Sequence, residues 1–282
     1  MKSRLFIFSI LSLALLLPLY QVSAHAENTV APIKILLVPG HDEEAWGAQY
    51  GRVKEANMNL AVAKRIRTIL KKDDRFKVYI TRDDKGYTKE FQSYFSLYDE
   101  EIKAFREKVK KETEDRIENG DFILKENPPH NKASDSAAVR LYGFNKWANE
   151  NDIDVVLHIH FNDHPRADVW TIGKYTGFAV YVPEEQMANS EESTELARSI
   201  FKELDKQYAT STFEKEKGGL VPDQTLIALG SHGSLEATVR SVLVEYGYIY
   251  EKKFKNYKNR HKAYDTMAKL TTQGIKNYFF SK

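Results

Sequence analysis

The stretch VVLHIHFND, residues 155–163, sets two histidines at the end of an apolar run. Apolar residues predominate from Ile153 to Ile159, and this composition is typical of a strand buried on both faces in a parallel sheet. Successive side chains of a strand point to opposite faces, so His158 and His160 must project from the same face. The sequence therefore predicts a buried strand over 153–160 that carries two imidazoles on one side.

Predicted strands and helices alternate on both sides of this stretch. Short apolar runs predict further strands, and longer segments with apolar residues three or four apart predict helices. This alternation indicates a single α/β domain over residues 31–282, with a twisted, mainly parallel central sheet flanked by helices. The further predicted strands cover 33–38, 76–81, 178–182 and 241–245, and the predicted helices cover 55–72, 134–150, 192–207 and 262–279.

A charged insertion over about residues 84–133 interrupts this order. Within it, the segment 99–118 is mostly charged, and a thin apolar stripe runs through Ile102, Phe105 and Val109. A helix of this kind packs on a surface but adds little to a core. We therefore expect the insertion to be helical and to lie outside the main core.

The first 26 residues have the features of a cleaved secretory signal. Lys2 and Arg4 precede an apolar stretch that is too short to span a bilayer, and small residues follow at Ala24 and Ala26. We expect an exported protein that acts in the periplasm, the cell wall or the medium, with no stable membrane span after cleavage. An uncleaved N-terminal anchor is the alternative.

The composition restricts the classes of binding partner and the types of metal ligand. Without residues 1–26, basic and acidic residues are equal in number, which gives no general attraction to nucleic acid. The sequence contains no cysteine, so disulfides are excluded and any metal site must use histidine and carboxylate ligands.

Four polar residues stand where the predicted elements would bring them together. His41, His160 and Glu245 follow or close three predicted strands, and Glu55 opens the first predicted helix on its inward stripe. Ligands of open α/β sheets bind beyond the carboxyl ends of the strands. Two histidines and one carboxylate with an open fourth position form a recurring catalytic zinc set, and a further carboxylate can move a proton. Glu245 is the candidate for that second role.

The ordered segments LLVPGHDEE, KEANMNLAVAKRIRTIL, VYITRD, LHIHFND and VLVEYGYI resemble the core motifs of the zinc-dependent, type 3 N-acetylmuramoyl-L-alanine amidases of bacterial cell-wall remodelling. The resemblance covers about residues 33–83 and 134–279. It implies one zinc ion held by His41, Glu55 and His160, and it implies that Glu245 is catalytic.

Other residues near these motifs either match or depart from the family pattern. Arg140 and Asn162 match it, which makes them candidates for substrate contact or for support of the site. Asp42 stands where the family usually has glycine, and His158 stands where it has serine. Both departures lie beside the predicted metal site. His158 is equally open to a structural role in the core and to a role in orienting a ligand or contacting substrate.

The resemblance implies an exported zinc hydrolase that cleaves the amide bond between N-acetylmuramic acid and L-alanine in peptidoglycan. Two alternatives stay open: an exported zinc peptidase that cuts within the stem peptides, and a catalytically silent homologue that binds or regulates at the wall. Some family members carry a helix that covers the active site until a partner displaces it. The insertion near 84–133 is therefore either a solvated surface element or the target of a protein activator.

Overall fold

The computed structural model describes residues 31–125 and 133–281. The predicted secretory signal lies outside the described residues, as does the segment 126–132 within the insertion. Residues Pro32–Lys282 form one compact unit, and the description below concerns this unit alone.

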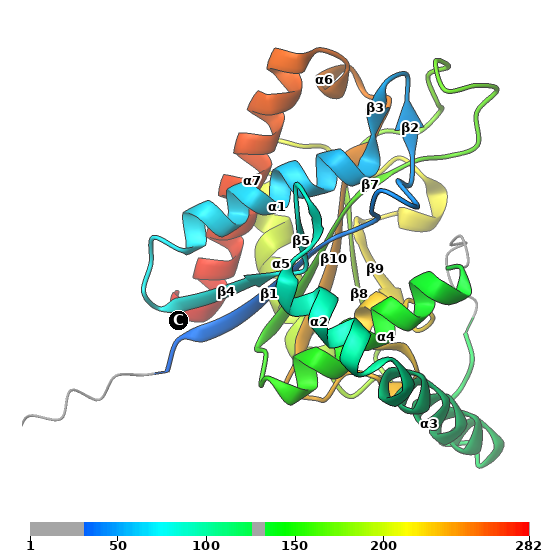
Figure 1. Ribbon diagram of the computed structural model, residues 1–282. Helices are drawn as coiled ribbons and strands as arrows, with labels where there is room; N and C mark the ends of the chain where they lie inside the picture. Colours follow the sequence, from blue (N-terminus) through cyan, green and yellow to red (C-terminus); the bar gives the residue numbers. More distant parts are fainter. Residues whose placement is uncertain (1–30, 126–132, 282) are drawn as a thin grey trace, which may run out of the picture. The chain divides into compact units, whose positions relative to one another are not determined.

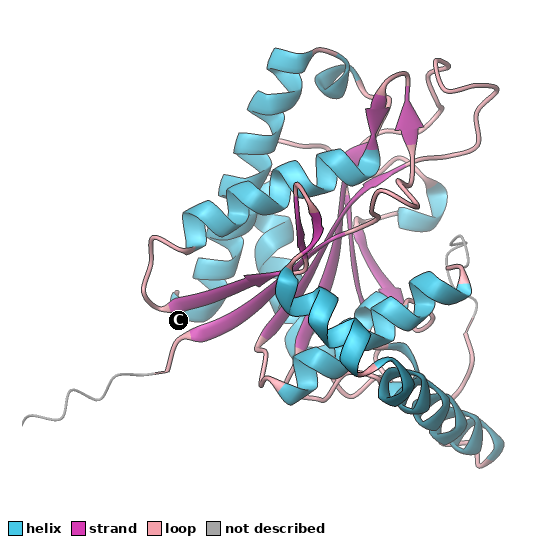
Figure 2. Ribbon diagram, in the orientation of Figure 1, coloured by secondary structure: helices cyan, strands magenta, loops and turns pink. Residues whose placement is uncertain are grey.

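A six-stranded sheet runs through the unit in the order β4-β1-β7-β10-β8-β9 (Figures 1 and 2). The first four strands of this order are parallel to one another, β8 is antiparallel to β10, and β9 is parallel to β8. The opening stretch becomes β7, which pairs with β1 on one side and with β10 on the other. In sequence order the strands are β1 (Ile33–Pro39), β4 (Phe76–Ile80), β7 (Val155–Asn162), β8 (Ala179–Pro183), β9 (Leu220–Asp223) and β10 (Arg240–Tyr248).

Helices cover both faces of the sheet, and two short hairpins stand at its carboxyl edge (Figure 1). The hairpins are β2 (Gln49–Tyr50) with β3 (Val53–Lys54), and β5 (Arg82–Asp83) with β6 (Gly86–Tyr87). The α-helices are α1 (Glu55–Leu70), α2 (Lys89–Leu97), α3 (Asp99–Glu118), α4 (Asp135–Glu150), α5 (Ser190–Leu204), α6 (Lys252–Lys255) and α7 (Tyr257–Phe280). Short 3-10 turns are η1 (Glu214–Glu216), η2 (Ile227–Leu229) and η3 (Ser231–Gly233).

The alternation of side chains along the strands divides the core between the two faces. Leu157 and Ile159 of β7 pack with α1, α5 and α7 in the larger cluster. Val156 points to the opposite face of the strand and packs with α2, α3 and α4 in a second cluster. Apolar residues lie on both faces of β7, and the strand is buried on both sides, as its mainly apolar sequence indicates. The α/β fold class predicted from the sequence is confirmed.

Some details of the elements differ from the sequence-based expectation. The short strand β9 and the helix α2 were not predicted individually, whereas β8, which runs antiparallel to β10, is compatible with a mainly parallel sheet. The last parallel strand does not end at Glu245 but continues to Tyr248, with a break in register between these two residues. Glu245 therefore lies within the strand, just before an irregularity that is typical of strands next to functional sites.

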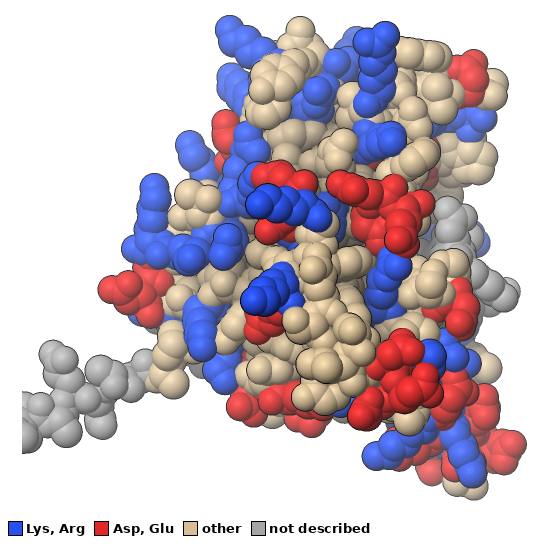
Figure 3. Space-filling view, viewed as in Figure 1, with Lys and Arg blue, Asp and Glu red and all other residues tan. Residues whose placement is uncertain are grey.

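The charged helix α3 has the bounds expected from its sequence and is attached by its thin apolar stripe. Ile102 and Val109 are buried against α4, while the remaining surface carries intermixed acidic and basic side chains (Figure 3, lower right). Within the described ranges, no helix is both long and apolar enough to cross a bilayer.

Arg82 ties the end of β1 to the start of α1. Its buried guanidinium donates to the carbonyl oxygens of Pro39, Gly40 and Ala56 at 3.2, 3.1 and 2.6 Å. We expect Arg82→Leu to lower the free energy of unfolding by about 3 kcal/mol, since it leaves three carbonyls without their charged donor. Urea unfolding measures this loss. Arg67→Leu, on the exposed side of α1, is the control, and an equal loss in both variants would contradict the assigned role of Arg82.

Candidate active site

Three side chains from three different elements meet at the carboxyl edge of the sheet. His41 follows β1, His160 lies near the end of β7, and Glu55 opens α1. Nε2 of His41 lies 3.2 Å from Oε2 of Glu55, and Nδ1 of His160 lies 3.1 Å from Oε1 of Glu55. One nitrogen or oxygen atom from each of the three residues lies within 4.8 Å of the others. The structure thus brings together the three residues that the sequence singled out as metal ligands.

The turn that carries His41 is held in an uncommon backbone conformation. His41 has φ of 61°, in the left-handed region that residues other than glycine rarely adopt. Its Nδ1 lies 3.2 Å from the carbonyl oxygen of Ala45, which accepts the Nδ1 hydrogen and leaves Nε2 to face Glu55. Oδ1 of Asp42 accepts the amide hydrogens of Glu44 and Ala45, so it closes the same turn. Strain of this kind persists only where surrounding contacts impose it, and it is common at functional sites.

Glu55 is buried, and both of its carboxylate oxygens are fixed from several directions. Oε2 accepts the amide hydrogen of Ala48 at 2.9 Å, and Oε1 accepts that of Phe161 at 3.2 Å. The side-chain amide of Asn59, one turn further along α1, donates to Oε1 and also to the carbonyl oxygen of Gly40. These contacts set the carboxylate between the two imidazoles.

Two glycines leave the space that this cluster needs. A Cβ atom added at Gly40 would lie 2.1 Å from the imidazole of His160. One added at Gly47, where φ is +71°, would lie 2.3 Å from Oε2 of Glu55 and 2.5 Å from the ring of His41. Any side chain at either position would push a member of the cluster away.

The cluster fits a zinc ion. Imidazole nitrogens and a carboxylate oxygen are zinc ligands, with bonds of about 2.0–2.2 Å, and three ligands around so small an ion must lie a few ångströms from one another. The separations of 3.2 and 3.1 Å from Glu55 to His41 and to His160 meet this requirement.

The charges within the cluster are strongly coupled. Burial raises the pKa of Glu55, but hydrogen bonds to His160 and His41 outweigh it and hold that pKa well below its usual range. Burial opposes protonation of His41, yet the hydrogen bond and charge of Glu55 raise the pKa of His41 above its ordinary value. For His160 burial dominates and lowers the pKa. The carboxylate is therefore ionised, and His160 favours the neutral form that metal binding requires.

Glu245 lies beside the cluster, in register with His160 on the neighbouring strand. Its Oε2 is buried and has no hydrogen-bonding partner among the described residues. Burial, and then the charges of Glu55 and Glu216, raise the pKa of Glu245 well above its ordinary value. A buried carboxyl with a raised pKa at the edge of a cleft can hold or transfer a proton near neutral pH.

Glu216 is a buried acid that the sequence analysis did not single out. Its carboxylate accepts hydrogen bonds from Tyr181 at 2.7 Å, Tyr248 at 3.1 Å and the side-chain amide of Asn162 at 2.6 Å. A cleft at the carboxyl edge of the sheet is lined by Asn162 and Glu216 together with His41, Glu55, His160 and Glu245. Asn162 thus lies in this cleft as a partner of Glu216. The surrounding sequence is rich in lysine, glutamate and glycine and carries no local sign that Glu216 is buried.

The remaining predicted site residues lie around the same cleft. Arg140 donates to Asp42 and Glu44 at 2.7 Å each, and Tyr87 donates to Asp42 at 3.0 Å. Asp42 and Arg140 therefore hold the turn after β1 to α4, and neither side chain joins the His–Glu–His cluster. His158 projects from the same face of β7 as His160 but is almost fully buried below it.

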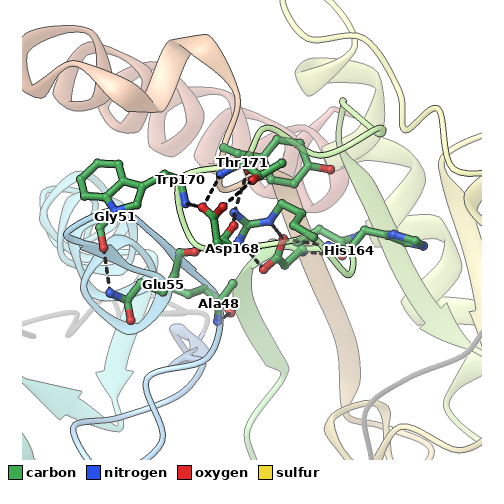
Figure 4. A network of polar contacts seen from close by, with 12 residues as sticks. Ala48, Gly51, Glu55, His164, Asp168, Trp170 and Thr171 are labelled. Atoms are coloured by element: carbon green, nitrogen blue, oxygen red, sulfur yellow. Dashed lines mark hydrogen bonds and ion pairs between the residues drawn. The ribbon is translucent and has the colours of Figure 1, made fainter.

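The loop between β7 and β8 lines part of the cleft. Figure 4 shows the network of polar contacts that this loop makes. Arg166 donates to the carboxylate of Asp163 at 2.9 and 2.8 Å, and it reaches the carbonyl oxygen of Gln49 in β2 at 2.8 Å. Asp168 accepts the amide hydrogens of Trp170 and Thr171, which closes the tip of the loop. Together these hydrogen bonds fix the loop next to the β2–β3 hairpin, which precedes Glu55.

Fold and site together define a class of protein: an α/β domain with a His–Glu–His cluster, and a further buried glutamate beside it, at the carboxyl edge of the sheet. A sequence model of one family, described as N-acetylmuramoyl-L-alanine amidase, matches residues 35–277. The chain belongs to this family, as the resemblance of its motifs implied. No curated protein sequence matches the chain.

Solved structures agree with the fold. An N-acetylmuramoyl-L-alanine amidase from Clostridium difficile 630 matches with a TM-score of 0.55 and 18% identity, over 90% of this chain and 100% of that one. The CwlD amidase from Clostridioides difficile, solved in complex with the GerS lipoprotein, gives 0.57 and 18%, over 89% and 100%. The apo form of an N-acetylmuramyl-L-alanine amidase from Mycobacterium abscessus gives 0.55 and 16%, over 89% and 100%. At these identities the likeness establishes a shared fold.

Proposed function

We propose that this protein is an exported zinc amidase that hydrolyses the amide bond between the lactyl group of N-acetylmuramic acid and the L-alanine of the stem peptide. The observation that carries the proposal is the meeting of His41, Glu55 and His160 beside Glu245, in a chain of the amidase family. Two imidazoles and one carboxylate suit zinc and leave a position for substrate or water.

His41, Glu55 and His160 would hold one zinc ion, through Nε2, a carboxylate oxygen and Nδ1 respectively. The bound ion would polarise the carbonyl group that is attacked and lower the pKa of a water molecule toward neutrality. The protein's own contribution is to fix the three donors, and the backbone amides of Ala48 and Phe161 do this for Glu55.

Glu245 would move the proton. Its buried, unpartnered Oε2 can accept a proton from the attacking water and deliver it to the alanine nitrogen as the carbon–nitrogen bond breaks. Its raised pKa makes the carboxylate a stronger base toward the attacking water than an exposed glutamate would be. The products are a stem peptide with a free amino group on L-alanine and a glycan with an intact lactyl carboxylate.

The site of action follows from the substrate. Peptidoglycan lies outside the cytoplasm, and the signal-like residues 1–26 support export to the periplasm or the cell wall. Among the residues that the structure describes, no membrane-spanning helix is found.

A protein activator is a further part of the proposal. Arg106 and Lys110 of α3 line the same cleft as Glu245, so displacement of this helix would change access to the site. The complex of the CwlD amidase with the GerS lipoprotein supports, by likeness of fold, a partner of this general kind.

Zinc content and product analysis test the proposed activity together. We expect about one zinc ion per chain, and we expect loss of wall digestion on chelation with recovery on adding zinc. Mass spectrometry of digested peptidoglycan should find stem peptides that begin with a free L-alanine amine. New termini within the stem would instead identify a peptidase. A zinc-loaded protein that releases no product, with its partner absent or present, would contradict an enzymatic role.

A further inference from the structure

The floor of the cleft contains a buried imidazole that the proposed reaction does not use. His158 lies on the same face of β7 as His160, one pleat further into the sheet, and is 1% exposed. Its neighbours in register are Val38 on β1 and Leu243 on β10, and all three line the cleft. Glu245, in register with His160, is its diagonal neighbour on this face.

Three polar atoms at this floor lack a partner in the protein. Within the described chain, neither Nδ1 nor Nε2 of His158 makes a hydrogen bond, and Oε2 of Glu245 makes none. Buried polar groups are almost always paired, because an unpaired one loses its hydration without compensation. A chain that keeps such groups on the wall of a cleft gives up stability there, which is a mark of sites shaped for a ligand.

We propose that His158 and Glu245 form a subsite that binds an uncharged amide group of the stem peptide. A neutral imidazole carries one donor and one acceptor, and so does a peptide unit, so the two can satisfy each other. The aliphatic side chains of Val38, Leu243 and Ile227 beside them suit a small apolar group such as the methyl of alanine. This subsite rests on the proposed function, since it assumes a stem peptide as the substrate.

The unpaired atoms at the floor favour an amide over a carboxylate. An amide offers both a donor and an acceptor to the two ring nitrogens of His158, whereas a carboxylate only accepts. Glu55 and Glu216 also border the cleft, so a ligand carboxylate would stand beside two acidic side chains. A neutral hydrogen-bonding group is the ligand that matches both conditions.

Two variants of His158 separate a binding role from a structural one. His158→Leu keeps an apolar side chain of similar size but removes both hydrogen-bonding atoms, whereas His158→Gln keeps one donor and one acceptor. We measure binding of a synthetic stem tripeptide that begins with L-alanine to the zinc-loaded protein by calorimetry, and stability by urea unfolding. We expect His158→Leu to weaken binding about tenfold while its unfolding midpoint equals or exceeds that of the wild type, and we expect His158→Gln to restore much of the affinity.

Thr81→Val is the matched control, because Oγ1 of Thr81 is also buried without a partner but does not line the cleft. It should leave peptide binding unchanged. Peptide binding does not require cleavage. If the protein binds the peptide through His158 but cleaves no peptidoglycan, the proposed activity is contradicted and the subsite is supported. The subsite is rejected if His158→Leu binds the peptide like the wild type, or if it lowers stability and affinity together and His158→Gln restores neither.

Discussion

Glu245→Gln is expected to abolish cleavage of peptidoglycan while zinc content stays at the wild-type level. The substitution keeps the size of the side chain but removes its ability to take up and release a proton. General acid–base catalysis contributes about a hundredfold to ten-thousandfold, so we expect cleavage to fall on the order of a thousandfold. Glu245 is in register with His160 but is not a member of the His–Glu–His cluster, and metal binding should therefore survive.

The control for this experiment is another buried acid that lies away from the site. Glu203 in α5 accepts hydrogen bonds from Lys206 and Asn277, and it does not line the cleft. Glu203→Gln should keep activity within about twofold of the wild type, with at most a modest loss of stability. The assignment of Glu245 fails if its Gln variant retains substantial activity. It also fails if zinc is lost together with activity, because the residue would then support the metal and not the proton transfer.

The central strands could be predicted because their sequences already carry the pattern that burial on both faces demands. The runs at 33–38 and 153–160 are mainly apolar and are bounded by polar or turn residues. The edge strand β9 could not, because it has four residues and includes Pro222, and its extended state depends on pairing with β8. Helix α2 is short and interrupted by polar residues, and it is held by the packing of Phe91 and Tyr94.

The same difference, between residues marked by a local sequence pattern and residues placed by tertiary contacts, explains which parts of the site could be predicted. His41, Glu55 and His160 each stand at the end of a strand or the start of a helix, where the topology of a parallel sheet brings residues together. Glu216 lies in a charged turn whose local composition predicts exposure. It is buried because Tyr181 and other residues from separate segments pack around it. Such a contact between distant segments cannot be predicted from the local sequence.

Gly40→Ala is expected to disable the metal site without touching any of its proposed ligands. The added Cβ would lie 2.1 Å from the imidazole of His160, well inside van der Waals contact, so the ring must turn away from Glu55. Changes that misplace a ligand typically cost ten- to a hundredfold in metal affinity, and we expect the upper end, about a hundredfold, because this clash acts on the ligand itself. Zinc affinity is measured by competition with a chelator of known strength, alongside urea unfolding.

A glycine with a comparable clash elsewhere provides the comparison that this prediction needs. A Cβ at Gly274 in α7 would lie 2.5 Å from the backbone of Ile200 in α5, on the face of the sheet that packs the larger core cluster. Gly274→Ala should therefore lower the free energy of unfolding while the folded protein binds zinc as tightly as the wild type. If Gly40→Ala binds zinc normally, the ion cannot depend on His160 in the position described. If both variants lose zinc equally, the loss reflects general instability, and the specific role of the space at Gly40 is excluded.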